Sequence, residues 1–225
     1  RKPFIRCGLR SLLKNTADKM DTVFFSQIND KLKASLDDYR YAHTLGVAGT
    51  AASLAMKWSA DTDKAELAGL LHDCAKCIPN DEKYRLCEEG SVSLNSFELK
   101  NPALVHAKLG AYIARRDYGV DDPEILDAIR THTTGSPGMT LLQKIIYTAD
   151  LIEPNRDDRI PDIGDTRRIA FEDLDEAVYL IVKRSIEYLE KNGLEIDTES
   201  VDTYRFYKEI HDRKRLGMYT VSEEA

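Results

Sequence analysis

The sequence predicts an all-α fold. The 225 residues include only 12 glycines and 7 prolines. Together these are a smaller fraction than the roughly 12% of glycine plus proline in an average chain, which disfavours a β-architecture with many tight turns. Apolar residues recur at helical spacing almost throughout, and no stretch shows the sustained alternation of half-buried strands. Hydrophobic residues make up 42% of the chain, enough to build a core, and this length favours one main domain.

Three helices are predicted in the first half of this domain. Residues 38–58 place apolar side chains three and four positions apart, which indicates an amphipathic helix. Residues 61–76 begin with acidic side chains and continue in an apolar run, which favours a second helix. A third is expected over 102–118, because Pro102 suits a first helical turn and Gly119 can end the helix.

Four further helices follow. An Asp-Pro pair opens the one expected over 123–132. The segment Gly-Ser-Pro-Gly at 135–138 is the clearest loop in the sequence. A helix over 141–152 comes next, and two more amphipathic helices are expected over 166–191 and 198–214.

The charge distribution separates the domain, expected over 25–215, from its two ends. The net charge is −7, yet the first 20 residues carry six Lys or Arg against one acid. This basic stretch could be a targeting presequence, but it lacks a long apolar core, so we expect residues 1–24 to be a flexible or peripheral extension and 216–225 a carboxy-terminal tail. An acidic body is a poor partner for polymeric nucleic acid. No apolar run approaches the 18 or so residues of a membrane span.

The cysteines indicate a reducing compartment. Cys7, Cys74, Cys77 and Cys87 show no spaced disulfide framework, so reduced thiols and a cytoplasmic location are expected. The Cys-x-x-Cys pair at 74–77 could be a thiol switch or part of a zinc site. We interpret both thiols as inert core or surface residues, because a single such pair is a weak motif.

Six residues are candidate metal ligands, because each lies on or beside the apolar face of a predicted helix. They are His43, His72, Asp73, His106, His132 and Asp150. One His on an apolar face is more often an ordinary core residue, and one Asp near a helix end is usually a cap. Five helices that each offer an inward ligand point instead to a shared metal, because unpaired buried acids and imidazoles are costly. The second His-Asp pair, His211-Asp212, has polar neighbours and is expected to be solvated and outside the site.

The order of these residues resembles that of the HD-domain metal-dependent phosphohydrolases, in the variant with two extra histidines for a second metal. Four segments resemble the bacterial YqeK family: YRYAHTLGV (39–47), LLHDCAK (70–76), HTTG (132–135) and KIIYTADLIEPNR (144–156). That family cleaves diadenosine tetraphosphate symmetrically to two ADP molecules. The similarity extends over residues 30–205 and implies an HD-domain helical bundle whose metal ligands come from five helices.

The resemblance also implies a metal arrangement. The first ion would be held by His43, His72, Asp73 and Asp150, and a second by His106 and His132, with Asp73 bridging and contributing to catalysis. The family implies two ions of iron, although imidazoles and carboxylates without thiolate suit manganese, cobalt or zinc as well. Two such ions can hold a bridging hydroxide as the nucleophile and stabilise the attacking and leaving oxygens, as cleavage of a phosphoanhydride requires.

Substrate contacts are expected from residues close to these ligands. Lys76 lies one helical turn after His72 and is assigned a catalytic contact with an oligophosphate oxygen, the alternative being a solvated lysine at a helix end. Arg156 can bind a phosphate bidentately, and the resemblance places an arginine at this position. Thr133, Thr134 and Gly135 belong to a loop that can approach a nucleotide closely.

Alternative functions stay open at this level. Ser136 stands where the family often has an arginine, which removes a phosphate contact and could change the substrate. Another HD-type nucleotide phosphohydrolase, such as a nucleotidase or a cyclic-nucleotide phosphodiesterase, fits the same ligands. A non-catalytic sensor of a nucleoside diphosphate and a dimetal oxidase are the other two possibilities. The partner is expected to be a small molecule, neither nucleic acid nor membrane, and the family suggests a homodimer.

Overall fold

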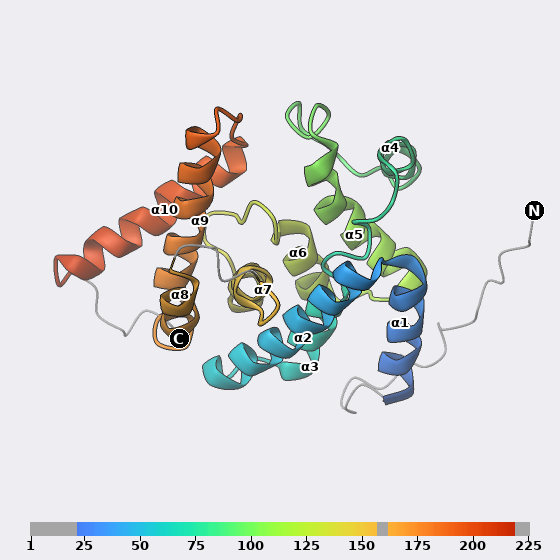
Figure 1. The fold of residues 1–225 in the computed structure, drawn as a ribbon, viewed down its shortest axis with the longest axis horizontal. Coiled ribbons are helices and arrows are strands. Elements are labelled where there is room, and N and C mark those ends of the chain that lie inside the picture. The colour runs from blue at the N-terminus through green and yellow to red at the C-terminus, as the bar shows by residue number, and fades with distance from the viewer. Residues whose placement is uncertain (1–21, 157–161, 219–225) are drawn as a thin grey trace, which may run out of the picture.

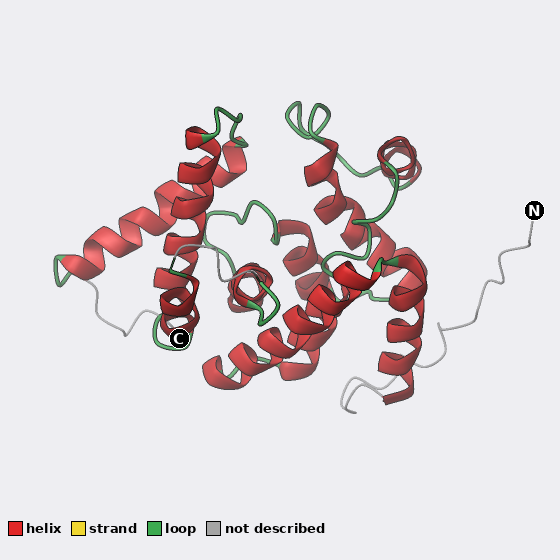
Figure 2. Ribbon diagram, in the orientation of Figure 1, coloured by secondary structure: helices red, strands yellow, loops and turns green. Residues whose placement is uncertain are grey.

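The computed structural model describes residues 22–156 and 162–218, and within these ranges the chain forms ten α-helices and no strand (Figures 1 and 2). The prediction of an all-α fold is therefore confirmed. The first five helices are α1 (Thr22–Ser35), α2 (Asp38–Trp58), α3 (Thr62–Leu71), α4 (Asn80–Glu89) and α5 (Pro102–Tyr118). The other five are α6 (Pro123–Thr131), α7 (Leu141–Ile152), α8 (Ile163–Ala170), α9 (Leu174–Lys191) and α10 (Thr198–Arg215).

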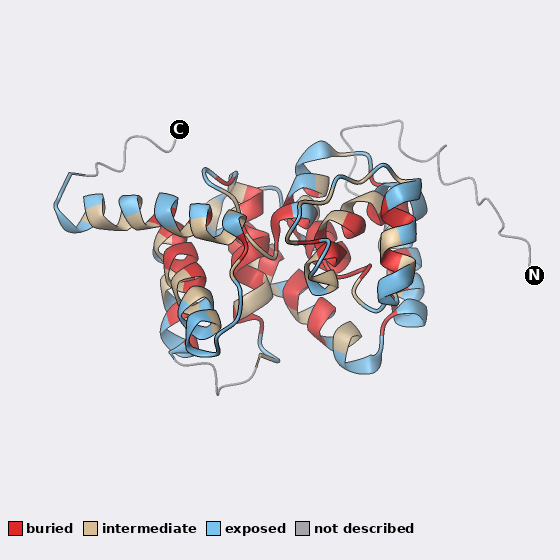
Figure 3. Ribbon diagram, turned by 90° about the horizontal axis from the view of Figure 1, so that it is seen from above, coloured by how far each residue is buried: buried red, intermediate tan, exposed pale blue. Residues whose placement is uncertain are grey.

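The helices are arranged around a central group made of α2, α3, α6 and α7. In Figure 1, α1, α4 and α5 lie on one side of this group, and α8, α9 and α10 lie on the other. Figure 3 shows that the buried faces point toward the interior, while α10 and the outer helices expose their opposite faces. The central group is therefore covered from both sides, which excludes water from the faces that it shares.

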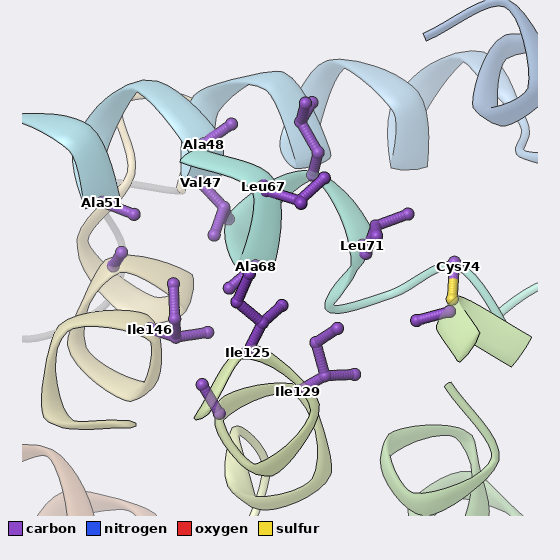
Figure 4. Packing of buried hydrophobic residues seen from close by; sticks show 14 of the residues in the cluster. Val47, Ala48, Ala51, Leu67, Ala68, Leu71, Cys74, Ile125, Ile129 and Ile146 are labelled. Carbon is purple, nitrogen blue, oxygen red and sulfur yellow. The ribbon is translucent and has the colours of Figure 1, made fainter. Parts of the chain in front are cut away.

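The main core lies where α2 and α3 pack on α6 and α7. Val47 and Ala51 of α2, Ala68 of α3 and Ile146 of α7 are among its buried residues, and Figure 4 shows them close together with Ile125 and Ile129 of α6.

The close packing of α2 on α3 depends on a glycine. A Cβ at Gly69 of α3 would lie 2.8 Å from the Cα of Ala48 on α2. A side chain at position 69 would therefore force the two helices apart. This close approach brings the end of α3 near the middle of α2.

A second, smaller core attaches α9 and α10 to α7. Its buried members include Tyr147 of α7, Val178 of α9 and Tyr207 of α10. The hydroxyl of Tyr207 also accepts a hydrogen bond from the backbone N–H of Met139, at 3.2 Å. The loop between α6 and α7 is thereby fixed against α10.

The helix predicted over 61–76 is shorter than expected. Helix α3 ends at Leu71, and residues 72–77 form tight turns in which the N–H of Cys74 donates to Leu71 and that of Lys76 donates to Asp73. Consecutive side chains of an α-helix point about 100° apart. His72 still has helical backbone angles, and both His72 and Asp73 are buried at the point where the helix gives way to the turns.

Other boundaries also differ from the prediction. The helix expected over 166–191 is two helices, α8 and α9, and Asp173 begins α9 by accepting the N–H of Glu176. Helices α1 and α4 were not predicted, and α1 starts at Thr22, inside the stretch assigned to the amino-terminal extension. Residues 1–21, which include Cys7 and most of the basic extension, lie outside the described residues, as do residues 219–225.

Candidate metal centre

The six predicted ligands come together from five helices or the turns that follow them. His43 belongs to α2, His106 to α5 and Asp150 to α7, whereas His72, Asp73 and His132 lie immediately after the ends of α3 and α6. The four imidazoles form a continuous row: the ring centroids are 5.3 Å apart from His43 to His72, 5.0 Å from His72 to His132 and 5.0 Å from His132 to His106. All four are buried.

His43, His72 and Asp150 form the first possible metal site. Their ligand atoms lie within 4.8 Å of one another. Asp150 Oδ1 is 3.0 Å from Nε2 of His43 and 3.8 Å from Nε2 of His72. Burial by itself raises the pKa of Asp150, but its contacts with these imidazoles and with Arg156 hold that pKa below the ordinary value. The carboxylate is therefore ionised at neutral pH.

A second possible site is formed by His72, Asp73 and His132, whose ligand atoms also lie within 4.8 Å of one another. The two groups therefore share His72. Oδ1 of Asp73 is 3.2 Å from Nε2 of His106 and 3.6 Å from Nε2 of His132, whereas Oδ2 is 3.5 Å from Nε2 of His72. Although burial raises the pKa of Asp73, its contacts with the three imidazoles hold it well below the ordinary value. One carboxylate thus faces imidazoles on both sides.

Hydrogen bonds at the far edge of each ring determine which nitrogen carries the proton. Three imidazoles bond through Nδ1 to the carbonyl oxygen three residues earlier: His72 to Gly69 at 2.7 Å, His106 to Ala103 at 2.6 Å and His132 to Ile129 at 2.7 Å. The Nδ1 of His43 instead lies 3.0 Å from a carboxylate oxygen of Glu153. Because these oxygens only accept, each Nδ1 carries a proton, which leaves Nε2 as the nitrogen that can bind a metal.

The residues fit a bound metal ion, because the Nε2 atoms of the four imidazoles face one another and the carboxylates. Nε2 of His43, Nε2 of His72 and Oδ1 of Asp73 are buried without a hydrogen-bond partner among the residues described. Nε2 of His106 lies 3.1 Å from Nε2 of His132, and burial lowers the pKa of His106 to about 4, which keeps that ring neutral. Buried acceptors without donors are unfavourable. A cation with nitrogen and oxygen ligands satisfies them together.

Two arginines contact the carboxylates from the rim of the centre. Arg40 Nη1 donates to Oδ2 of Asp73 at 2.7 Å. Arg156 Nη2 donates to Oδ1 of Asp150 at 2.7 Å, and its Nε donates to the Asp150 carbonyl at 2.9 Å. The two side chains remain 21% and 26% exposed. The sequence pattern predicts a role for Arg156 and not for Arg40, although Arg40 lies one helical turn before His43.

Lys76 and Thr133 lie beside the other end of the imidazole row. Lys76 Nζ is 3.1 Å from Nε2 of His106 and 3.8 Å from Oδ1 of Asp73, and burial lowers the pKa of this lysine. Thr133 Oγ1 lies 3.3 Å from Nε2 of His106 and 3.2 Å from Nε2 of His132. Both predicted substrate contacts therefore reach the centre itself.

The next residues of the same loop turn toward α10. Thr134 donates from its hydroxyl to a carboxylate oxygen of Glu199 at 3.2 Å. Gly135 is buried at a φ of 68°, and a Cβ there would lie 2.7 Å from Cγ2 of Thr203. A glycine is required on both counts. These two residues hold the loop in place and do not contact the imidazole row, and Ser136 after them is half-buried.

Two other features of the sequence, the second His-Asp pair and the Cys-x-x-Cys pair, contribute no candidate ligand. His211 bonds through Nδ1 to Glu176 at 2.7 Å and stacks on Tyr179, so it is half-buried between α9 and α10 and not solvated as expected. Cys74 is buried, with its thiol 3.5 Å from the Gly110 carbonyl, and Cys77 is exposed. Burial raises the pKa of the Cys74 thiol, which makes that thiol unreactive.

No helix within the described part of the chain is long and apolar enough to cross a membrane.

Comparison with known proteins relates this geometry to a family. The HD domain family matches residues 40–155, a range that contains all six candidate ligands. The chain is 41% identical over 175 residues to the symmetrical bis(5'-nucleosyl)-tetraphosphatase of Bacillus subtilis, covering 78% of this chain and 92% of that protein. It is 35% identical over 183 residues to the protein of the same name from Staphylococcus aureus, covering 80% and 93%.

A solved structure has the same fold. It is described as a predicted HD superfamily hydrolase involved in NAD metabolism, from Clostridium acetobutylicum. The TM-score is 0.79 at 35% sequence identity, and the match covers 83% of this chain and 97% of the other.

Proposed function

This chain belongs to the HD-domain family and, within it, to the symmetrical bis(5'-nucleosyl)-tetraphosphatases, and from this premise we propose that it hydrolyses diadenosine tetraphosphate to two molecules of ADP. One observation above all supports this: the Nε2 atoms of four imidazoles and two carboxylates converge in a centre that two arginines and a lysine border. Metal ligands next to cations are what a phosphoanhydride substrate requires.

We further propose that two ions bind, and that they are iron. His43, His72 and Asp150 would hold one ion, His106 and His132 the other, and Asp73 would contribute to both. The orientation of Asp73 supports sharing, because its two oxygens face different imidazoles. When bound, the ions act as Lewis acids on phosphoryl oxygens and lower the pKa of coordinated water.

The cations around the centre bind and orient the oligophosphate. The side chains of Arg40, Lys76 and Arg156 are 21%, 32% and 26% exposed and can reach a ligand that arrives from solvent. Arginines bind phosphate oxygens in pairs of hydrogen bonds, and positive charge stabilises the negative charge that spreads over the phosphoryl oxygens in the transition state. The hydroxyl of Thr133 can donate to one more oxygen. Direct contacts from Thr134 and Gly135 stay predictions.

Product analysis tests this function. Protein loaded with metal is incubated with diadenosine tetraphosphate, and the nucleotides are separated by anion-exchange chromatography. ADP as the sole product is expected. ATP together with AMP would contradict symmetrical cleavage, and intact substrate in the presence of bound metal would contradict the activity.

The family resemblance also leads us to propose that the protein is a homodimer and is located in the cytoplasm. We further propose that the folded domain of each chain extends over residues 25–215. Light scattering on the purified protein tests the dimer. Limited proteolysis followed by mass spectrometry tests the boundaries, because cleavage is expected to concentrate outside this range.

A further inference from the structure

His43 is held differently from the other three imidazoles of the centre. The others donate from Nδ1 to a backbone carbonyl, which is neutral. His43 donates to the carboxylate of Glu153, with 3.0 Å between Nδ1 and Oε1. Glu153 is only 1% exposed, and it follows the last residue of α7, three positions after Asp150.

The carboxylate of Glu153 is fixed at both of its oxygens. While Oε1 faces His43, Oε2 accepts the backbone N–H of Asn155 at 2.6 Å. The amide of Asn155 in turn donates to the carbonyl of Ala42, next to His43 in α2. The turn after α7 is therefore attached to α2 by two hydrogen bonds, one of which ends on a candidate metal ligand.

Helix α2 leaves room for this carboxylate at Gly46. A Cβ at position 46 would lie 2.3 Å from Oε2 of Glu153 and 3.1 Å from Nδ2 of Asn155. Glycine is unfavourable inside a helix, yet here it stands one turn after His43, where the carboxylate packs. Helix α2 contains a second glycine, Gly49, about one turn after Gly46. A Cβ at position 49 would meet nothing within 4 Å.

A charged acceptor on Nδ1 has two effects on the opposite nitrogen. It fixes the orientation of the ring, and it makes Nε2 a stronger electron-pair donor to a metal. We propose that Glu153 is a positioning residue, which acts through His43 and with the space provided by Gly46 to set the metal affinity of the position formed by His43, His72 and Asp150. This inference rests on the metal-dependent function proposed above.

Glu153→Gln is the direct test, because glutamine keeps the size but removes the charge. It also cannot accept at both ends, since one of its terminal atoms is an amide nitrogen, so either the Nδ1–H of His43 or the N–H of Asn155 loses its acceptor. The matched control is Glu98→Gln. Glu98 is likewise buried, 4% exposed, and accepts from the backbone of Asn95 and from Lys108, but no imidazole contacts it.

The measurement is Co²⁺ affinity, by titration of the visible absorption and by competition with a chelator. We expect Glu153→Gln to weaken the binding of one ion by about 10–100-fold and to alter its absorption band, while Glu98→Gln binds as the parent protein does. Gly46→Ala is expected to act in the same direction as Glu153→Gln, because the carboxylate must move away. Gly49→Ala is its control and is expected to leave the affinity unchanged.

Three results would overturn the inference. In the first, both Glu153→Gln and Gly46→Ala bind Co²⁺ with the parent affinity and spectrum. In the second, Glu98→Gln loses as much affinity as Glu153→Gln, which would indicate a general effect of burying an amide. In the third, the parent protein binds no Co²⁺, which removes the metal role altogether. Parent protein that binds Co²⁺ but leaves diadenosine tetraphosphate intact would contradict only the proposed activity, and the comparison of affinities would still decide the role of Glu153.

Discussion

Asp73 has more contacts with the candidate ligands than any other carboxylate of the centre. Its two oxygens lie between 3.2 and 3.6 Å from the Nε2 atoms of three imidazoles. Arg40 donates a hydrogen bond to one of these oxygens, Oδ2. The Asp73 carboxylate thus balances the charge of the Arg40 guanidinium, and its two oxygens still face imidazoles on opposite sides. Removal of this side chain should therefore affect both proposed ions together.

Asp73→Ala is expected to abolish binding of both metals and to lower kcat/KM by more than about 100-fold, because the ions supply several kcal/mol of transition-state stabilisation. Metal content is measured by mass spectrometry of the purified protein and turnover by product analysis. Helical content by circular dichroism should hardly change. Asp212→Ala is the matched control, since it removes the acid of the other His-Asp pair, and the carboxylate of Asp212 accepts from Lys208 at the surface of α10. Hydrolysis at the parent rate by Asp73→Ala would contradict the metal mechanism.

Arg40→Ala is expected to reduce kcat/KM for diadenosine tetraphosphate by roughly 10–100-fold, the range for one lost charge-assisted hydrogen bond. Initial rates over a range of substrate concentrations give this value. Arg168→Ala provides the control, because Arg168 is an exposed arginine of α8 that pairs with Glu172, just after the end of that helix. Equal kinetics for the parent and Arg40→Ala would remove Arg40 from the substrate site.

The elements differ in how far the sequence could predict them. Helices α2 and α7 begin and end as expected, because apolar spacing marks both and the side chains of Asp37 and Thr140 cap their first turns. Helix α4 is largely polar and has few buried residues, so apolar spacing gives no indication of it. The early end of α3 has no local cause in glycine or proline, because Pro79 lies well beyond it. The turns after Leu71 are set by the packing of the centre, and spacing along one helix does not contain that information.

The same limit explains which site residues were found. His43 and Asp150 stand out as polar residues on apolar faces. Glu153 does not, because its partner His43 is 110 positions away and only the crossing of α2 and α7 brings them together. Apolar spacing predicts the six candidate ligands, and the resemblance to a family groups them around two metals, but the proton position on each imidazole required the contacts at Nδ1.

Gly49, on the exposed face of α2, and Gly69, at the contact of α3 with α2, predict opposite effects on stability. Gly49→Ala is expected to raise the free energy of unfolding by about 0.5–1 kcal/mol, because alanine favours the helix and the position is open. Gly69→Ala is expected to lower it by about 1–3 kcal/mol, because the added methyl group presses on the backbone of α2 at Ala48. Urea denaturation followed by circular dichroism measures both. A stabilised Gly69→Ala protein would contradict the close helix packing described here.

For the molecule as a whole, the centre exists only in the folded state. Its ligands come from segments between residues 43 and 150, and these meet only when α2, α3, α5, α6 and α7 pack together. Without a cation, the fold holds bare nitrogens and carboxylates against one another in a buried space. Folding and metal binding are therefore coupled, because the ion binds the native chain far better than the unfolded one.

This coupling predicts that removal of metal lowers the melting temperature. A metal present at 100 times its dissociation constant stabilises the native state by about 2.7 kcal/mol, which corresponds to roughly 5–11 °C for a chain of this size. Calorimetry of protein treated with a chelator, and of the same protein after metal is returned, measures the difference. Asp73→Ala should melt at one temperature with or without metal, because the shared carboxylate is gone. If the parent protein also melted at a single temperature, the buried nitrogens would have to be satisfied by protons, and the six residues would be a structural network with no metal in it.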